Sequence, residues 1–210
     1  MKRQYMTIGK WQMPGGTKPN PIEVMVALKW IVLQQKEDKA LVIVRDCIDW
    51  EFFDGSNTFF EPAKPMTWEK SYLRKYLNRE FFEKAFSETE KKSVLTTVVR
   101  AENNSEYATL GGNDTEDKIF LLSVSEVNKY FMEKDFDARA EMFMIDENHG
   151  KMEIESFWHK WWTRTPGEEQ NMMSVVNEIG QINLEGIDVD ADEIGIRPAM
   201  WVDLALLKEK

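Results

Sequence analysis

The sequence predicts a single α+β domain, built mostly of antiparallel sheet with short helices in the middle of the chain. Three observations predict it. Apolar β-branched runs lie near both ends, helix-capping patterns lie between them, and no linker, repeat or low-complexity tract divides the 210 residues. Strands and helices that segregate along a chain are typical of α+β rather than alternating α/β domains. We therefore expect one domain over residues 1–210.

The N-terminal part predicts a strand followed by a β-hairpin. Met6–Trp11 has the pattern of a short strand. Two apolar runs, Ile22–Leu33 and Ala40–Ile48, are separated by the polar residues 34–39. Two β-branched runs joined by a short polar segment indicate a hairpin.

The middle of the chain predicts short helices. Thr67 is the expected N-cap of the first, and two apolar stripes on different faces indicate a break near Asn78. Ser87 and Ser123 are each followed three residues later by Glu, which is the spacing of a capping box. The helix after Ser123 should end near Phe131.

The remaining strands are predicted from apolar runs bounded by Gly, Pro and polar turns. Residues 132–155 show no regular pattern, and residues 101–117 contain a polar surface loop. The predicted strands are residues 94–99, 119–122, 157–163, 173–176, 181–184 and 194–202.

Composition excludes several classes of function. Hydrophobic residues make up 42% and charged residues 30%, as in a globular protein. The net charge of −10 would repel a polyanion, so we expect no nucleic-acid partner. No apolar run has the length of a signal peptide or membrane span. As written, the chain is expected to be cytoplasmic and not membrane-bound, unless an export segment was removed.

The scarcity of Cys and His limits metal and nucleophile chemistry. Cys47 is the only cysteine, so no intramolecular disulfide or cysteine-based zinc site can form, and two histidines cannot build a three-His site. Cys47 lies in an apolar strand without a neighbouring His, so we interpret it as a small buried hydrophobe. We therefore expect no catalytic residue, metal or cofactor.

Four motifs follow one another along the chain. They are W-x-x-S-x-L-R-x-x-L-N from Trp68 to Asn78, D-x-x-F-L-L-S from Asp117 to Ser123, W-W-x-R from Trp161 to Arg164, and G-I-R-P-A from Gly195 to Ala199. In this order they resemble a family of bacterial domains of unknown function, with a core at about residues 6–202. The resemblance implies an organisation of the chain and no activity.

The closing pattern carries a second resemblance. A Trp-rich strand, a Gly turn and a final strand with Arg resemble C-type-lectin-like folds, which formylglycine-generating enzymes also use. The resemblance implies a C-type-lectin-like fold alone. The chemistry of those enzymes needs a cysteine pair, and this chain has one cysteine.

The candidate binding residues lie in the Trp-rich segment: Trp158, Trp161, Trp162 and Arg164. Neighbouring residues of a strand face opposite ways, so Trp161 and Trp162 can both be buried only if both faces of the sheet are covered. Otherwise one of these rings, or Trp158, lines a pocket or interface. The core interpretation is favoured for most of the rings.

Five other polar residues are expected to be structural: Arg74, Asn78, Asp117, Glu126 and Arg197. An arginine among apolar residues either clamps an anionic ligand or is a buried structural donor, and we favour the second role. For Arg197 we expect burial, with a carboxylate or several carbonyls as partners. Asp117 and Glu126 are the candidate carboxylates.

Together these patterns predict a non-catalytic binding or interaction module that recognises a protein or a glycan through the Trp-rich strand. The alternative is an enzyme of unrecognised type that uses Asp117, Glu126 or Arg164 in a cleft. Paired carboxylates in a cleft would favour the enzyme, and an exposed apolar patch would favour the binding module.

Overall fold

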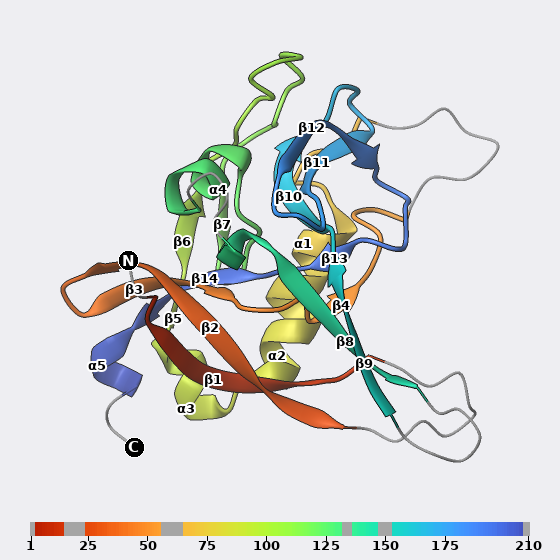
Figure 1. Ribbon diagram of the computed structural model, residues 1–210. Coiled ribbons are helices and arrows are strands. Elements are labelled where there is room, and N and C mark those ends of the chain that lie inside the picture. The colour runs from red at the N-terminus through yellow and green to blue at the C-terminus, as the bar shows by residue number, and fades with distance from the viewer. Residues whose placement is uncertain (1–2, 15–23, 56–64, 132–135, 147–152, 208–210) are drawn as a thin grey trace.

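The computed structural model describes residues 3–14, 24–55, 65–131, 136–146 and 153–207 (Figure 1). They form a single β-rich domain with curled, mostly antiparallel sheets and a few short helices. The prediction of an α+β domain dominated by antiparallel strands is thereby confirmed.

Two five-stranded sheets form the body of the domain. All neighbours in the first sheet are antiparallel, and in the second only β10 and β13 run parallel. The first sheet has the order β1 (Tyr5–Gln12), β2 (Met25–Lys36), β3 (Lys39–Val44), β14 (Ala199–Asp203), β5 (Val94–Leu95). The second has the order β12 (Ile182–Asp188), β11 (Met172–Val176), β10 (Trp161–Pro166), β13 (Gly195–Ile196), β4 (Asp49–Trp50).

Two-stranded ribbons and short helices complete the described structure. The ribbons are β6 (Thr97–Val99) with β7 (Thr115–Asp117), and β8 (Ala140–Asp146) with β9 (Glu153–His159). The α-helices are α1 (Tyr72–Tyr76), α2 (Phe82–Ala85), α3 (Glu88–Ser93), α4 (Val124–Tyr130) and α5 (Leu204–Leu207). A π-helix, η1 (Leu77–Phe81), lies between α1 and α2, and a 3-10 turn, η2 (Phe136–Ala138), precedes β8.

The predicted N-terminal hairpin is present as β2 and β3, and the strand predicted before it is β1. Trp30 is fully buried and donates a hydrogen bond from Nε1 to the carbonyl oxygen of Ile8 at 2.8 Å. The polar handle of this large ring is therefore satisfied inside the core, as a buried indole requires.

The chain passes between the two sheets at two adjacent places. Residues 45–48 connect β3 to β4, and Arg197 with Pro198 connects β13 to β14. The crossovers are hydrogen-bonded to each other, since the Val44 amide donates to the Pro198 carbonyl at 2.9 Å and the Ile48 amide donates to the Ile196 carbonyl at 3.0 Å. The strand predicted over residues 194–202 is therefore two short strands. Pro198 lies where the chain leaves one sheet, so no ladder needs its missing N–H.

The sequence predicted Thr67 as the N-cap of the first helix, and this prediction was wrong. Ser71 is its N-cap and accepts a hydrogen bond from the Arg74 amide, whereas the buried Thr67 hydroxyl has no hydrogen-bond partner among the described residues. The helix also does not break at Asn78 but widens there into η1. The wider turn shifts the phase of the following side chains, which explains why the two apolar stripes lie on different faces. Both predicted capping boxes are confirmed, at the starts of α3 and α4.

Several strand predictions were wrong. Residues 94–99 are divided between two sheets, and residues 119–122 are buried without forming a strand, with a single bridge between Phe120 and Ala199. The segment 132–155, where no pattern was seen, contains β8 and the start of β9. The aromatic strand predicted over residues 157–163 is two strands, because the chain turns from β9 into β10 at Lys160.

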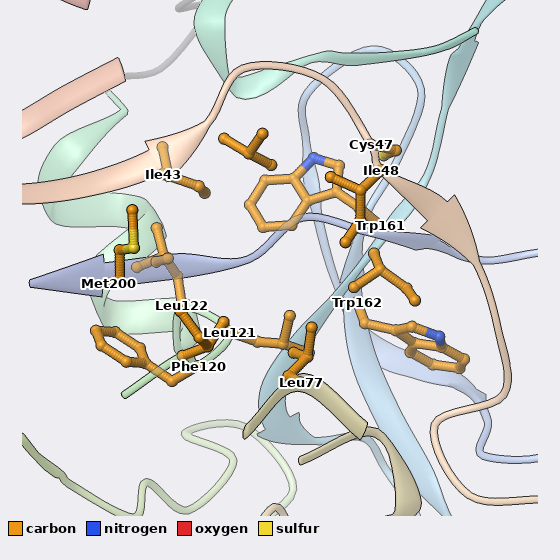
Figure 2. Packing of buried hydrophobic residues seen from close by; sticks show 14 of the residues in the cluster. Ile43, Cys47, Ile48, Leu77, Phe120, Leu121, Leu122, Trp161, Trp162 and Met200 are labelled. Carbon is orange, nitrogen blue, oxygen red and sulfur yellow. The ribbon is translucent and has the colours of Figure 1, made fainter. Parts of the chain in front are cut away.

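Most of the buried hydrophobic residues in the described ranges form one core that reaches from the first sheet, across the crossovers, to the second sheet and the helices. Figure 2 shows Trp161 and Trp162 within it, with Ile48 and Leu77 nearby. None of the helices in the described part of the chain is long and apolar enough to cross a membrane.

Candidate functional site

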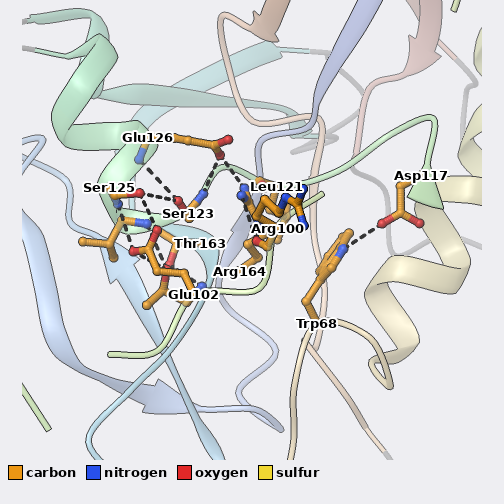
Figure 3. A network of polar contacts seen from close by, with 12 residues as sticks. Trp68, Arg100, Glu102, Asp117, Leu121, Ser123, Ser125, Glu126, Thr163 and Arg164 are labelled. Carbon is orange, nitrogen blue, oxygen red and sulfur yellow. Dashed lines mark hydrogen bonds and ion pairs between the residues drawn. The ribbon is translucent and has the colours of Figure 1, made fainter. Parts of the chain in front are cut away.

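Asp117 is a buried carboxylate that binds three side chains. Its Oδ2 accepts a hydrogen bond from Trp68 Nε1 at 2.9 Å (Figure 3). The same atom accepts one from Thr115 Oγ1 at 2.6 Å. Its Oδ1 accepts from Arg74 Nε at 2.7 Å. Hydrogen bonds to the ionised form stabilise a buried carboxylate, so this arrangement is that of a structural anion.

Asn78 joins the first two sequence motifs through backbone groups. Its Oδ1 accepts hydrogen bonds from the amides of Lys118 at 2.8 Å and Ile119 at 3.1 Å. Its Nδ2 donates to the carbonyl oxygens of Ile119 at 2.7 Å and Arg74 at 3.1 Å. The amide thus satisfies backbone groups of Lys118 and Ile119 that a neighbouring strand would otherwise bond.

Arg164 connects the start of α4 to the second sheet. Its guanidinium forms an ion pair with Glu126 and donates from Nη1 to the Leu121 carbonyl at 2.7 Å. Glu126 also accepts the Ser123 amide at 3.0 Å and so closes the capping box of α4 (Figure 3). The pair is therefore part of the helix start.

Arg197 is fully buried at the junction of the two sheets, as expected, but its partners are carbonyls. It donates to the backbone oxygens of Val44 at 3.0 Å, Ala138 at 3.1 Å and Asp137 at 2.8 Å. The candidate carboxylates Asp117 and Glu126 instead bind Arg74 and Arg164. Burial lowers the pKa of Arg197 to about 10, which leaves it protonated at neutral pH.

The three tryptophans of the Trp-rich segment have different environments. Trp161 and Trp162 are both fully buried, because both faces of β10 are covered. Their Nε1 atoms donate to the carbonyls of Ala138 at 3.0 Å and Glu51 at 2.9 Å. Of the three rings only Trp158, which is 44% exposed, is accessible from the surface.

The motifs that carry the family resemblance therefore hold one another in place. The first binds the second through Asn78 and through the pair of Arg74 with Asp117. The third binds the second through Arg164 and Glu126. These contacts connect the motifs into a structural scaffold. Asp117 and Glu126 belong to separate networks, and neither lines the cavities described in this structure.

An exposed patch lies on β9 and on the η2 segment that leads into β8. We define the ribbon patch as Phe136, Arg139, Ile154 and Trp158. Phe136 is 73% and Ile154 59% exposed, and the Arg139 guanidinium lies 4.6 Å from the ring centre of Phe136 and 5.7 Å from that of Trp158. The patch thus places a cation between two exposed aromatic rings, beside a strand whose residues 154–158 are all exposed.

Only Trp158 of this patch was found by the sequence argument. Phe136, Arg139 and Ile154 lie in or beside the segment that showed no pattern. A usable signal was present, since Met142 to Ile145 is an apolar run flanked by Glu141 and Asp146, which is consistent with a strand.

A cavity of about 250 Å³ lies between the β1–β2 hairpin, the first crossover and β8. Its wall is mainly apolar and includes Trp11, Leu28 and Phe143, with Asp46 and Cys47 at the crossover. Burial raises the pKa of Asp46, an effect that Arg45 and Arg197 oppose. Burial also raises the pKa of the Cys47 thiol to about 12, so no thiolate forms near neutral pH.

Within the described ranges, no group of three or more His, Cys, Asp or Glu side chains is placed to hold a metal ion. Asp188, the last residue of β12, accepts a hydrogen bond from Asn171 Nδ2 at 3.1 Å. The side chains that the geometry brings together are thus the scaffold networks and the ribbon patch.

Comparison with known proteins found a family and no individual relative. No curated protein and no solved structure matches the chain. A family model described as a domain of unknown function (DUF6273) matches residues 37–204. The match includes all four motifs and begins at the β2–β3 turn, later than the expected residue 6. The chain therefore belongs to the DUF6273 family of domains of unknown function.

Proposed function

We propose that this domain is a non-catalytic interaction module that binds a protein partner through the β8–β9 ribbon. The observation that carries the proposal is the ribbon patch. Trp158 lies three residues before the fully buried Trp161, yet 44% of it is exposed beside Arg139. Trp and Arg are the residues that most often dominate the binding energy of protein interfaces.

The backbone of the ribbon supports the same proposal. Among the strands that the structure describes, β9 pairs with β8 alone, and Figure 1 shows the ribbon extending from the body of the domain. An exposed strand edge presents amide and carbonyl groups that another chain can pair with. Side-chain anchors and a backbone edge on one strand are the two components of strand-addition recognition.

The rival functions have less support. An enzyme that uses Asp117, Glu126 or Arg164 needs at least one of these groups free for substrate, and each is bound by neighbours in the scaffold. A nucleic-acid partner is opposed by the net charge of −10. A membrane partner has no supporting feature in the described structure, and we propose none.

We also propose that the domain has a C-type-lectin-like arrangement of its strands. The Trp-rich β10 beside the closing β13–β14 segment with Arg197 supports a C-type-lectin-like arrangement, by analogy only. That analogy makes a glycan the alternative ligand, with Trp158 as the stacking surface. The experiment below separates a glycan from a protein.

The test is capture of partners from an extract of the source cells on the immobilised chain. Trp158→Ala should reduce capture of a specific protein roughly thirtyfold, the effect of losing about 2 kcal/mol at a hot spot. Tyr72→Ala is the matched control, because Tyr72 is 43% exposed on α1, away from the ribbon. The control should capture as much as the unchanged chain.

Two results would overturn the proposal. Equal loss of capture in both variants would show that the effect is not specific to the ribbon. Capture that survives protease treatment of the extract but is lost after glycosidase treatment would identify a glycan ligand instead.

A further inference from the structure

The outer edge of β8 is already occupied, and this fixes the direction of its backbone groups. The Glu141 carbonyl accepts a hydrogen bond from the Cys47 amide at 2.8 Å. The Ile145 amide donates to the Pro14 carbonyl at 3.0 Å. Residues 141 and 145 of β8 therefore direct their backbone groups away from β9.

The same pattern can be extended across the ladder to β9. Trp158 is directly opposite Glu141, and Ile154 is directly opposite Ile145. In an antiparallel ladder, opposite residues either exchange both hydrogen bonds or exchange none. Trp158, Ile154 and, by the period of two, Ser156 therefore direct their amide and carbonyl groups away from β8.

These outward groups form a free edge. In the described part of the chain, no backbone hydrogen bond other than those of the ladder engages residues 154, 156 or 158. Native proteins usually cover, shorten or charge such an edge. Here two of the three residues, Ile154 and Trp158, are large, apolar and exposed.

We propose that the partner of this edge is a second copy of the chain, which adds its own β9 antiparallel across a two-fold axis at Ser156. This inference rests on the proposed function and names its partner. Pairing about Ser156 matches all three outward residues: Ser156 with Ser156, and Ile154 with Trp158 of the second copy. The two ribbons then form one four-stranded sheet.

The side chains fit this register. A small, uncharged residue lies on the axis, where identical residues face each other. Ile154 meets Trp158 of the second copy, an aromatic and β-branched pair that stabilises neighbouring strands. Glu155 faces Phe157 of the second copy, so no carboxylate lies directly opposite another.

The neighbouring registers fit less well. Centring the axis on residue 155 places Glu155 opposite Glu155, and like charges directly opposite are destabilising. Centring it on residue 157 leaves the outward groups of Ile154 without a partner in β9. The register about Ser156 satisfies the most backbone groups and avoids the repulsion.

The interface also has a defined response to salt. Each copy carries a net charge of −10, so the two copies repel each other at long range. The contact itself is made by backbone groups and apolar side chains. Screening should therefore strengthen association as salt rises, opposite to the behaviour of an interface held by ion pairs.

The test is sedimentation equilibrium of the full chain over about 1–100 µM, a range that resolves micromolar association. The unchanged chain should dimerise, more tightly at high salt. Ser156→Pro removes the amide N–H that faces outward and breaks no hydrogen bond between β9 and β8. Proline is tolerated in a strand where the amide faces away from the neighbouring strand. It should weaken association at least about tenfold, whereas Ser156→Ala should have no effect.

Cross-linking fixes the register. Ser156→Cys should form a dimer under mild oxidation, because hydrogen-bonded antiparallel neighbours place their Cα atoms about 5.5 Å apart, within disulfide range. Glu155→Cys should cross-link much more slowly. Both variants keep Cys47, which is buried.

A monomer at every concentration, or a dimer that Ser156→Pro leaves intact, would overturn the inference. If the chain is monomeric and partner capture still depends on Trp158, only the inference of a second copy fails. If capture is also independent of Trp158, the proposed function fails with it.

Discussion

Trp158 and Trp161 are three residues apart, yet one is half exposed and the other fully buried. Arg139 and Arg197 differ in the same way. Arg197 is enclosed by three carbonyls and the ring of Trp161, whereas Arg139 lies over exposed rings of the ribbon patch. Trp and Arg side chains thus hold the fold together in the body of the domain, whereas on the ribbon the same residue types are exposed at the surface.

The difference begins at Lys160, where the chain leaves the ribbon and enters the second sheet. Beyond that point both faces of β10 are covered, and Trp161, Trp162 and Arg164 each have hydrogen-bond partners in the body of the domain. Before it, β9 has one neighbouring strand within the described ranges, β8. The recognisable motifs consequently report how the fold is held together, and the proposed function lies in a segment that has no motif.

The largest expected effect tests the scaffold side of the comparison. Arg197→Ala should destabilise the domain by about 3–5 kcal/mol, because it removes the buried donor shared by the carbonyls of Val44, Asp137 and Ala138 and creates a cavity between the sheets, although Ala138 keeps its bond from Trp161. Urea unfolding followed by circular dichroism measures the change. An unchanged unfolding midpoint would show that Arg197 does not hold the junction.

Arg197→Lys is the matched variant, since it keeps the charge. A lysine ammonium is a compact donor and cannot reproduce the planar fork that reaches three separate carbonyls. It should recover less than half of the lost stability. Full recovery would mean that charge alone matters at this site.

The parts of this structure that could be predicted from the sequence are the local ones. The capping boxes at Ser87 and Ser123 and the β2–β3 hairpin depend on residues close in sequence. The burial of Arg197 followed from its apolar neighbours. Its partners could not be predicted, because they depend on the crossovers that bring Val44 and Asp137 beside it.

The errors have the same origin. Thr67 and Ser71 are both acceptable N-caps, and in the structure it is the Ser71 hydroxyl that accepts the Arg74 amide. The ribbon was missed because β8 is stabilised by β9 and by residues far away in sequence, Cys47 and Pro14. The candidate site lies in this long-range structure, so the sequence could identify Trp158 but not the residues beside it.

A second prediction concerns an exception to the rule that buried polar groups of the body are compensated. Burial raises the pKa of Asp49 from 3.8 to about 6, and a hydrogen bond from the Trp50 amide only partly opposes this. The folded state binds the proton more tightly than the unfolded state, so the contribution of Asp49 to stability is fully present below pH 3.8 and is lost as pH rises through about 6.

Asp49→Asn should therefore stabilise the domain at pH 7.5 by roughly 1–2 kcal/mol and have almost no effect near pH 4. The amide oxygen can still accept the Trp50 N–H. Urea unfolding at both pH values measures the gain, with Asp190→Asn as an exposed control. A gain of equal size at both pH values would contradict the role of the carboxylate charge.

The smallest expected effect tests the surface side of the comparison. Trp158→Ala should change the free energy of unfolding of the dilute, monomeric chain by no more than about 0.5 kcal/mol, the usual range for surface substitutions. The ring is partly exposed, and its contact with Arg139 is a surface cation–π interaction. A loss of 2 kcal/mol or more, measured by the same urea unfolding at high dilution, would mean that Trp158 belongs to the scaffold.

The loss of partner binding expected for this variant could then arise from unfolding of the ribbon. A change near zero, with lost binding, would instead separate the two roles within one short stretch of chain, because Trp158 would bind without stabilising while Trp161 stabilises without being able to bind.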